Sequence, residues 1–168
     1  MDAVDITVLR ALKAWREAGE DALLVTVVKT WGSSPRPVGA MLAVRVGVEM
    51  VGSVSGGCIE DDVFQRFADI RDMPATTLLR YGVSAEEAHR FGLPCGGTIE
   101  LMVECNPSLQ SIDALLTQLD AGLLVQRRVD RASGSVELEP VKAYVPLQLT
   151  EQAMSLCIGP RWRMLLIG

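Results

Sequence analysis

Hydrophobic residues recur at helical spacing in three segments of the chain. In the first segment, Val4, Val8 and Leu12 fall on one face of a helix. A fourth, short helix is indicated by Ser84 and Glu87, which have the spacing of a capping box. These patterns predict helices over residues 4–18, 60–71, 84–90 and 108–121.

Runs rich in β-branched residues alternate with these helical segments. The clearest run is Ala22–Thr30, which has the composition of a buried strand. Similar runs predict strands over residues 22–30, 41–46, 50–54, 76–81, 98–104, 123–130 and 135–139, the last two as a hairpin. Strands mixed with helices in this way indicate an α/β fold, in which we expect a mixed sheet with flanking helices.

Composition narrows the class of protein. The 168 residues, 49% of them hydrophobic, are enough for one domain with its own core, which we assign to residues 1–160. A formal net charge of −5 argues against general binding to nucleic acid or to an anionic membrane surface, so any anion site must be local. The first residues do not have the pattern of an export signal, and no run of about 18 apolar residues occurs. We therefore expect a cytoplasmic protein with reduced thiols and no membrane span.

The last residues form a basic-to-apolar run that reaches a glycine at Arg163–Gly168. The first strand of a dinucleotide-binding domain begins in this way, just before its glycine-rich turn. We therefore expect residues 161–168 to begin a Rossmann-like C-terminal domain that is truncated here, which would make this chain the N-terminal domain of a two-domain protein. The alternative is that the run is the last core strand of one domain.

Two short segments nearly repeat each other, and each carries a cysteine beside paired glycines. We call residues 55–60 (SGGCIE) the first glycine corner and residues 94–100 (PCGGTIE) the second glycine corner. Glycine pairs allow a sharp turn and a close approach of the backbone to a ligand. A thiol at such a turn is available for chemistry, and the repetition suggests one site built from both corners.

Cys58 and Cys95 are the thiols of these corners. Cys58 lies at or just before a predicted helix, where free N–H groups and the helix dipole favour a thiolate. Cys95 follows a proline on a shaped loop. A thiolate can act as a nucleophile, a redox group or a soft metal ligand. The alternative is that both are small residues at tight turns, and we expect Cys105 and Cys157 to be packing residues.

Polar residues near the corners add candidates for binding. Ser33, Ser34 and Arg36 lie in a loop between strands and could hold an anionic group, the alternative being a rigid surface turn. Glu60 and Glu100 have matching places after the glycine pairs, where each could accept from a ring donor or act in acid–base chemistry. Glu60 could equally complement a helix N-terminus.

Two single residues have simpler interpretations. Trp31 flanks a strand and is predicted to belong to the core, although it could stack on a planar ligand. His89 is the only histidine, and on a short charged helix it is predicted to be solvated. Because no Cys-x-x-Cys motif accompanies it, a structural zinc site has little support.

Three motifs together resemble the XdhC/CoxI family of accessory proteins for xanthine dehydrogenase and related molybdenum hydroxylases. They are residues 32–36 (GSSPR), residues 51–60 (VGSVSGGCIE) and residues 92–100 (GLPCGGTIE), in the order of the family. The resemblance is strong over residues 5–105 and weak beyond them. Jointly the three motifs are specific, whereas any one of them alone would not be.

The resemblance implies a chaperone rather than an enzyme. Members of the family bind the molybdenum cofactor, whose molybdopterin part chelates the metal through a dithiolene. They protect it, cooperate with a cysteine desulfurase that installs its sulfido ligand, and deliver it to the apo-enzyme. The resemblance also implies a Rossmann-like C-terminal domain, with a possible dinucleotide there, and we expect a homo-oligomer.

Under this resemblance the motif residues acquire roles. Soft thiolates suit molybdenum, so Cys58 is the first candidate ligand and Cys95 the second. The loop residues would bind the phosphate of the cofactor, backbone N–H groups of the corners would meet phosphate or pterin edges, and a glutamate would pair with pterin donors. These groups are Ser33, Ser34 and Arg36; Gly56, Gly57, Gly96 and Gly97; and Glu60 and Glu100.

Three alternatives remain from the residues themselves. The first is a thiol-based oxidoreductase or redox switch, in which Cys58 and Cys95 form a reversible disulfide; this requires their Cα atoms within about 7 Å. The second is a metalloenzyme that also uses His89 or a glutamate, which the ligand spacing supports poorly. The third is an interaction domain whose glycines serve only the fold.

Overall fold

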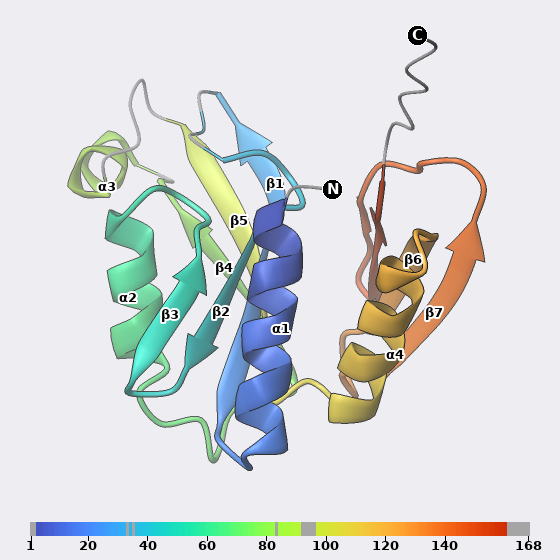
Figure 1. Cartoon of the computed structure of the whole chain (residues 1–168). Helices are drawn as coiled ribbons and strands as arrows, with labels where there is room; N and C mark the ends of the chain where they lie inside the picture. Colours follow the sequence, from blue (N-terminus) through green and yellow to red (C-terminus); the bar gives the residue numbers. More distant parts are fainter. Residues whose placement is uncertain (1–2, 33, 35, 83, 92–96, 161–168) are drawn as a thin grey trace, which may run out of the picture.

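A five-stranded sheet forms the first part of the structure, a computed structural model that describes residues 3–32, 34, 36–82, 84–91 and 97–160 (Figure 1). Its strands lie in the order β3-β2-β1-β5-β4, and the recorded pairs are antiparallel. The central strand β1 is buried over its first seven residues, as its β-branched sequence predicts. The strands are β1 (Ala22–Trp31), β2 (Met41–Arg45), β3 (Glu49–Gly52), β4 (Thr76–Tyr81) and β5 (Thr98–Cys105).

A second, four-stranded antiparallel sheet follows, in the order β7-β6-β9-β8. The predicted hairpin is confirmed as β6 and β7, whereas β8 and β9 were not predicted. β9 is a short apolar run that becomes a strand because it pairs with β6 along its whole length. The strands are β6 (Leu124–Asp130), β7 (Val136–Val141), β8 (Gln148–Leu149) and β9 (Ala153–Ile158).

The four predicted helices are present. They are α1 (Ala3–Glu17), α2 (Cys58–Arg66), α3 (Ala85–Arg90) and α4 (Leu109–Asp120). α2 ends at Arg66, five residues earlier than predicted. Beyond it, the Asp69 carboxylate accepts the backbone N–H of Arg71 at 3.1 Å and pairs with its side chain. Such a local turn competes with helix continuation. Phe67 and Ile70 nevertheless remain buried.

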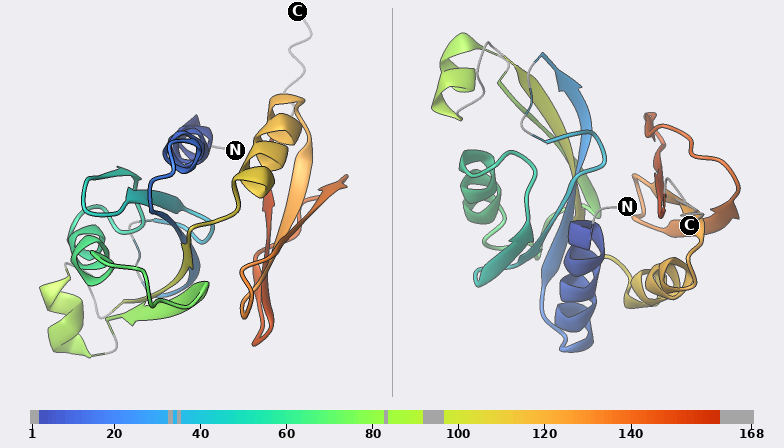
Figure 2. Two further views of the ribbon diagram at one scale, coloured as in Figure 1. Left: turned by 90° about the horizontal axis from the view of Figure 1, so that it is seen from below. Right: turned by 45° about the horizontal axis from the view of Figure 1, so that its top comes forward.

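Two hydrophobic clusters lie on the two faces of the first sheet. On one face, residues of α1 and α4 pack with the second sheet around Met102; on the other, α2 packs around Leu101. Figure 2 shows α1 between the first sheet and α4, with α2 on the opposite side. The predicted α/β class is therefore confirmed, although the described strands form two antiparallel sheets instead of one mixed sheet. The predicted start of a Rossmann-like domain at residues 161–168 lies outside the described residues.

A buried ion pair joins the two sheets. The guanidinium of Arg127 in β6 donates two parallel hydrogen bonds, of 2.8 and 2.7 Å, to the carboxylate of Glu104 in β5. Both side chains are only 3% exposed, so neither charge has water to replace a lost partner. The pair thus fixes how the second sheet lies against the first.

Breaking this pair from one side should destabilise the fold strongly. For Glu104→Leu we expect the free energy of unfolding to fall by about 3–5 kcal/mol, because a buried guanidinium is left unpaired. The double variant Glu104→Leu/Arg127→Met should recover most of that loss. Urea denaturation measures both, with Asp120→Asn as control, because its exposed pair with Arg10 should contribute less than about 1 kcal/mol. A double variant as unstable as the single one would contradict this prediction.

Candidate functional site

The predicted motifs gather at one end of the first sheet, which we call the loop end. Antiparallel pairing places the end of β1 beside the start of β5, with Trp31 opposite Thr98. It also places the end of β3 beside the start of β2, with Gly52 opposite Leu42. The segment after Trp31, the first glycine corner and Gly97 of the second corner therefore lie at the same end (Figure 1).

The loop after β1 contacts the second corner directly. A Cβ atom added to Gly32 would lie 3.3 Å from the Cα of Gly97, so only glycine at position 32 lets these backbones approach so closely. The first corner follows β3, which is separated from β5 by β2 and β1. Three strand spacings correspond to about 14 Å. The two corners thus share one end of the sheet, with residues 32–40 between them.

Glu60 holds the first corner together. Its carboxylate lies in the first turn of α2 and is only 6% exposed. Four successive backbone N–H groups donate to it at 2.8–3.2 Å, and two serine hydroxyls add further hydrogen bonds. These donors are the N–H groups of Val54, Ser55, Gly56 and Gly57 and the hydroxyls of Ser53 and Ser55.

These hydrogen bonds determine the charge of Glu60. Burial opposes its ionisation, but the hydrogen bonds from the Ser55 hydroxyl and the surrounding backbone outweigh burial and lower its pKa to about 2. Gly56 and Gly57, which the sequence predicts to donate their N–H groups to phosphate or pterin, donate them to Glu60 in this structure. The carboxylate itself is likewise engaged with the corner, as the alternative role at a helix N-terminus predicts.

The first corner is otherwise as the sequence predicts. Gly57 caps α2 and Cys58 is its first residue. Gly56 and Gly57 have φ angles of 91° and 150°, which favour glycine, and a Cβ added to either would meet no atom within 4 Å. The outer side of the corner is therefore bare backbone next to open space. Two donors near Cys58 are already used, because the N–H of Gly57 binds Glu60 and the N–H of Ile59 binds the hydroxyl of Ser55.

Glu100 does not mirror Glu60. It lies within β5 on the face that carries Met102, whereas α2, which bears Glu60, packs on the opposite face. Its carboxylate is 7% exposed and accepts two hydrogen bonds, of 3.1 and 2.7 Å, from the guanidinium of Arg80. The matching sequence positions of the two glutamates therefore do not give matching positions in the fold.

The loop after β1 is pinned at its far side by hydrogen bonds between Gly39 and Val27 and between Val27 and Ala40. Ser34 donates its hydroxyl to the carbonyl of Arg36 at 2.9 Å, which stiffens the loop. The Nε of Arg36 is buried and has no hydrogen-bond partner among the residues that the structure describes. It is the atom of this loop that a bound anion would satisfy.

Several predicted site residues cannot be placed. Ser33, Cys95 and Gly96 lie outside the described residues, and for Cys58 only the backbone is described. Their roles as cofactor and molybdenum ligands stay predictions, as does the disulfide alternative. Among the described side chains, no group of three or more His, Cys, Asp and Glu could hold a metal ion.

The other cysteines and the histidine behave as predicted. Cys105 is half-buried, and burial raises the pKa of its thiol. Cys157 is buried and accepts the N–H of Val145 at 3.4 Å. His89 is exposed on α3.

No helix in the described part of the chain is long and apolar enough to cross a membrane.

Trp31 corrects a prediction. It is 37% exposed and not part of the core, because β1 continues beyond its buried residues to the loop end. Lys29 and Arg80 lie over its ring and were not identified from the sequence. Lys29 and Trp31 do alternate along the strand, but their proximity to Arg80 depends on strand order, which the sequence does not reveal.

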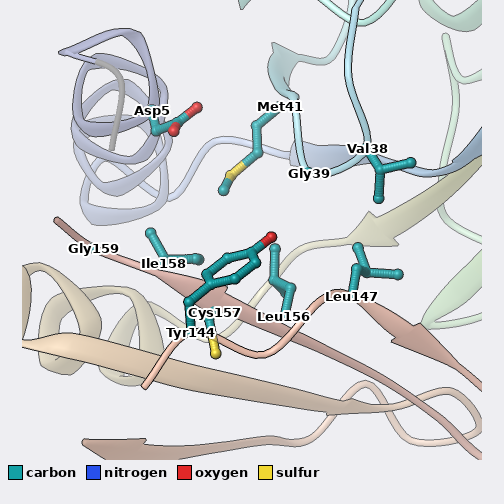
Figure 3. Close-up of a pocket in the computed structure, with 10 residues that line it drawn as sticks. All are labelled: Asp5, Val38, Gly39, Met41, Tyr144, Leu147, Leu156, Cys157, Ile158 and Gly159. Carbon is teal, nitrogen blue, oxygen red and sulfur yellow. The ribbon is translucent and has the colours of Figure 1, made fainter. Parts of the chain in front are cut away.

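A small cavity lies between the two sheets, away from these residues. It has a volume of about 40 Å³ and is lined by residues of α1, of the loop before β2 and of the second sheet. Figure 3 shows Met41 and Tyr144 reaching into it from opposite sides. This volume suits a water molecule rather than a cofactor ring, so this cavity is too small to hold the predicted cofactor.

Several known proteins are similar in sequence to this chain, each over a different length. The model of the XdhC and CoxI family matches residues 15–82. A Bacillus subtilis protein, named as a probable xanthine dehydrogenase subunit, is 36% identical over 95 residues, covering 55% of this chain and 29% of the relative. The molybdenum cofactor insertion chaperone PaoD of Escherichia coli is 32% identical over 136 residues, covering 81% of this chain and 42% of the relative.

A solved structure shares the fold. A crystal structure described as a xanthine dehydrogenase from Bacillus halodurans superposes with a TM-score of 0.64 at 24% identity. The match covers 95% of this chain and 45% of that one. This chain thus spans less than half the length of the curated relatives and of the solved structure that it matches.

Removing the charge of Glu60 should loosen the first corner. For Glu60→Gln we expect the free energy of unfolding at pH 7 to fall by about 2 kcal/mol, because backbone donors lose a charged acceptor. The pKa of about 2 lies below the ordinary value of 4.5, so the carboxylate stabilises the fold fully above about pH 5 and less as pH falls towards 2. Denaturation at several pH values should show the difference from wild type shrinking in acid.

The control for this prediction is Glu86→Gln, a change in the exposed first turn of α3. It should alter the free energy of unfolding by less than about 0.5 kcal/mol. A Glu60→Gln effect that is absent at pH 7, or that is constant from pH 7 to pH 3, would contradict the role assigned to the carboxylate.

Proposed function

We propose that this chain is a member of the XdhC and CoxI family and a maturation factor, not an enzyme, that binds the molybdenum cofactor and inserts it into a xanthine dehydrogenase-type hydroxylase. The names of two relatives support this assignment, since one is a molybdenum cofactor insertion chaperone and the other a probable component of xanthine dehydrogenase. Because the chain covers less than half of either relative, we propose the function only for the part of those proteins that this chain matches.

One observation carries the proposal. The described parts of the three family-like motifs lie at the loop end of the first sheet, although up to 65 residues separate them along the chain. Antiparallel pairing around β1 is the cause, since it returns each motif to the same end. A large cofactor can contact all three there without entering a closed pocket.

Each motif has a task in this proposal. The Cys58 and Cys95 thiolates would bind molybdenum, because soft sulfur ligands suit this metal centre. The Nε of Arg36 would donate to an anionic group of the cofactor, which would satisfy a buried donor that has no partner. Glu60 would keep the first corner in shape without touching the cofactor.

The later steps belong to the same proposal. Sulfuration would require a cysteine desulfurase, and delivery would require the apo form of the molybdenum hydroxylase. An open site suits such delivery, because a partner enzyme can approach a cofactor that is not enclosed. We propose a homo-oligomer as the working form.

Loss of either corner thiol should weaken cofactor retention. We expect Cys58→Ser and Cys95→Ser each to retain at least about tenfold less cofactor than wild type, since even outer-shell changes at metal sites cost about 10–100-fold in affinity. Protein incubated with the molybdenum cofactor is desalted, and its molybdenum and oxidised pterin are measured by elemental analysis and fluorescence.

Cys105→Ser is the matched control, because Cys105 is half-buried at the opposite end of β5. It should retain as much cofactor as wild type. Equal retention by all three variants would overturn the thiolate ligands while leaving the chaperone function in place. A wild-type protein that retains neither molybdenum nor pterin would overturn the function itself.

A further inference from the structure

A β-bulge in β1 changes which side chains face the side of the first sheet that carries the second sheet. Val27 pairs with Leu101, but the next recorded pair is Lys29 with Glu100, so Val28 is an extra residue. Without this insertion, Lys29 and Trp31 would lie on the α2 side of the sheet. The bulge places the side chains of Lys29 and Trp31 on the face that carries Glu100. Bulges are frequent next to active sites, where they change the direction of a side chain.

The result is a compact charged group at the loop end, which we call the cation cluster: Lys29, Trp31, Arg80 and Glu100. The Nζ of Lys29 lies 4.6 Å from the centre of the Trp31 ring, and the guanidinium carbon of Arg80 lies 5.1 Å from it. Both cations are therefore held against one indole. Glu100 provides one negative charge, so the cluster keeps a net charge of +1 in a chain of net charge −5.

Both cations still have N–H groups that can donate to a ligand. Lys29 is exposed and forms no ion pair with any residue that the structure describes. Arg80 donates to Glu100 through Nε and one terminal nitrogen, which leaves its second terminal nitrogen without a partner in the described part of the chain. Half of its side chain is exposed. A charged ammonium and a partly free guanidinium suit an oxyanion.

The position of the cluster connects it to the corners. Trp31 is followed by Gly32, and its partner Thr98 is preceded by Gly97. These two glycines are packed against each other, so neither places a side chain beside the indole. A ligand that lies over the loop after β1 can therefore reach the cluster from the second corner.

At the first corner, the N–H and hydroxyl groups that could bind an external anion already bind Glu60. Its four backbone N–H groups and two serine hydroxyls surround the carboxylate of Glu60. An external phosphate would have to displace a buried, ionised side chain there, whereas at the cation cluster it would meet uncompensated positive charge. The cluster is thus the more favourable place for an anion.

We propose that the cation cluster binds a phosphomonoester group. Under the proposed function, on which this inference rests, that group is the phosphate of the pterin cofactor. Lys29 and Arg80 contact the phosphate oxygens, and Trp31 is a positioning residue that keeps the two cations together. Arg36 is then free to contact another polar edge of the ligand.

Equilibrium binding to the full chain tests the assignment. The probes are the oxidised, fluorescent pterin phosphate derived from the cofactor, the same pterin after phosphatase treatment, and inorganic phosphate as competitor. Lys29→Gln should weaken binding of the phosphorylated pterin about tenfold, the loss of one charge-assisted hydrogen bond. It should leave the affinity for the dephosphorylated pterin unchanged.

Three further variants separate charge from structure. Lys142→Gln removes an exposed lysine just after β7 and should bind like wild type. Trp31→Leu should weaken binding of the phosphorylated pterin only, and Trp31→Phe should restore part of it, because a ring is retained. Circular dichroism and urea denaturation confirm that each variant is folded.

The outcomes are distinct. If wild type binds the phosphorylated pterin but Lys29→Gln and Lys142→Gln bind it equally, the cluster is wrong and the proposed function remains. If wild type does not bind either pterin, both proposals are overturned. If inorganic phosphate competes as strongly as the pterin phosphate and Lys29→Gln loses both, the anion site is supported but its assignment to the cofactor is overturned.

Discussion

The antiparallel pairing of β1 with both β2 and β5 is the constraint on which the candidate site depends. Because β1 is central, its end, the start of β5 and the start of β2 must share one end of the sheet. The first corner follows at the same end because β3 returns beside β2. Motifs that are distant in sequence thereby become neighbours without a closed pocket.

Residues that have equivalent places in the sequence have different hydrogen-bond partners in the structure. Both corners contain a Gly-Gly pair and a glutamate, yet Glu60 binds the backbone of its own corner and Glu100 binds Arg80. The difference follows from the element that comes next. In the first corner, residues 54–57 lie between β3 and α2, and their N–H groups donate to the carboxylate of Glu60. The second corner leads directly into β5, whose N–H groups bind neighbouring strands.

Local patterns predicted most of the elements, because helix periodicity and β-branched runs depend on nearby residues. The two sheets, the strand β9 and the early end of α2 could not be predicted in this way. β9 depends on its partner β6, and the chain beyond α2 forms a separate turn at Asp69 and Arg71. For the site, the sequence identified the glycine corners and the loop but missed Lys29 and Arg80. Their meeting at Trp31 requires both the strand order and a one-residue bulge.

The two faces of the sheet constrain how one ligand could use the whole loop end. The first corner lies on the α2 side, about 14 Å across the sheet from β5 by strand spacing, and the cation cluster lies on the opposite face. A ligand bound at both must therefore cross the end of the sheet over the loop after β1, where the backbones of Gly32 and Gly97 lie close together. An elongated molecule with a metal at one end and a phosphate at the other meets this requirement, whereas a compact anion would bind the cluster alone. The length of the ligand, and not its charge alone, thus decides whether it contacts both.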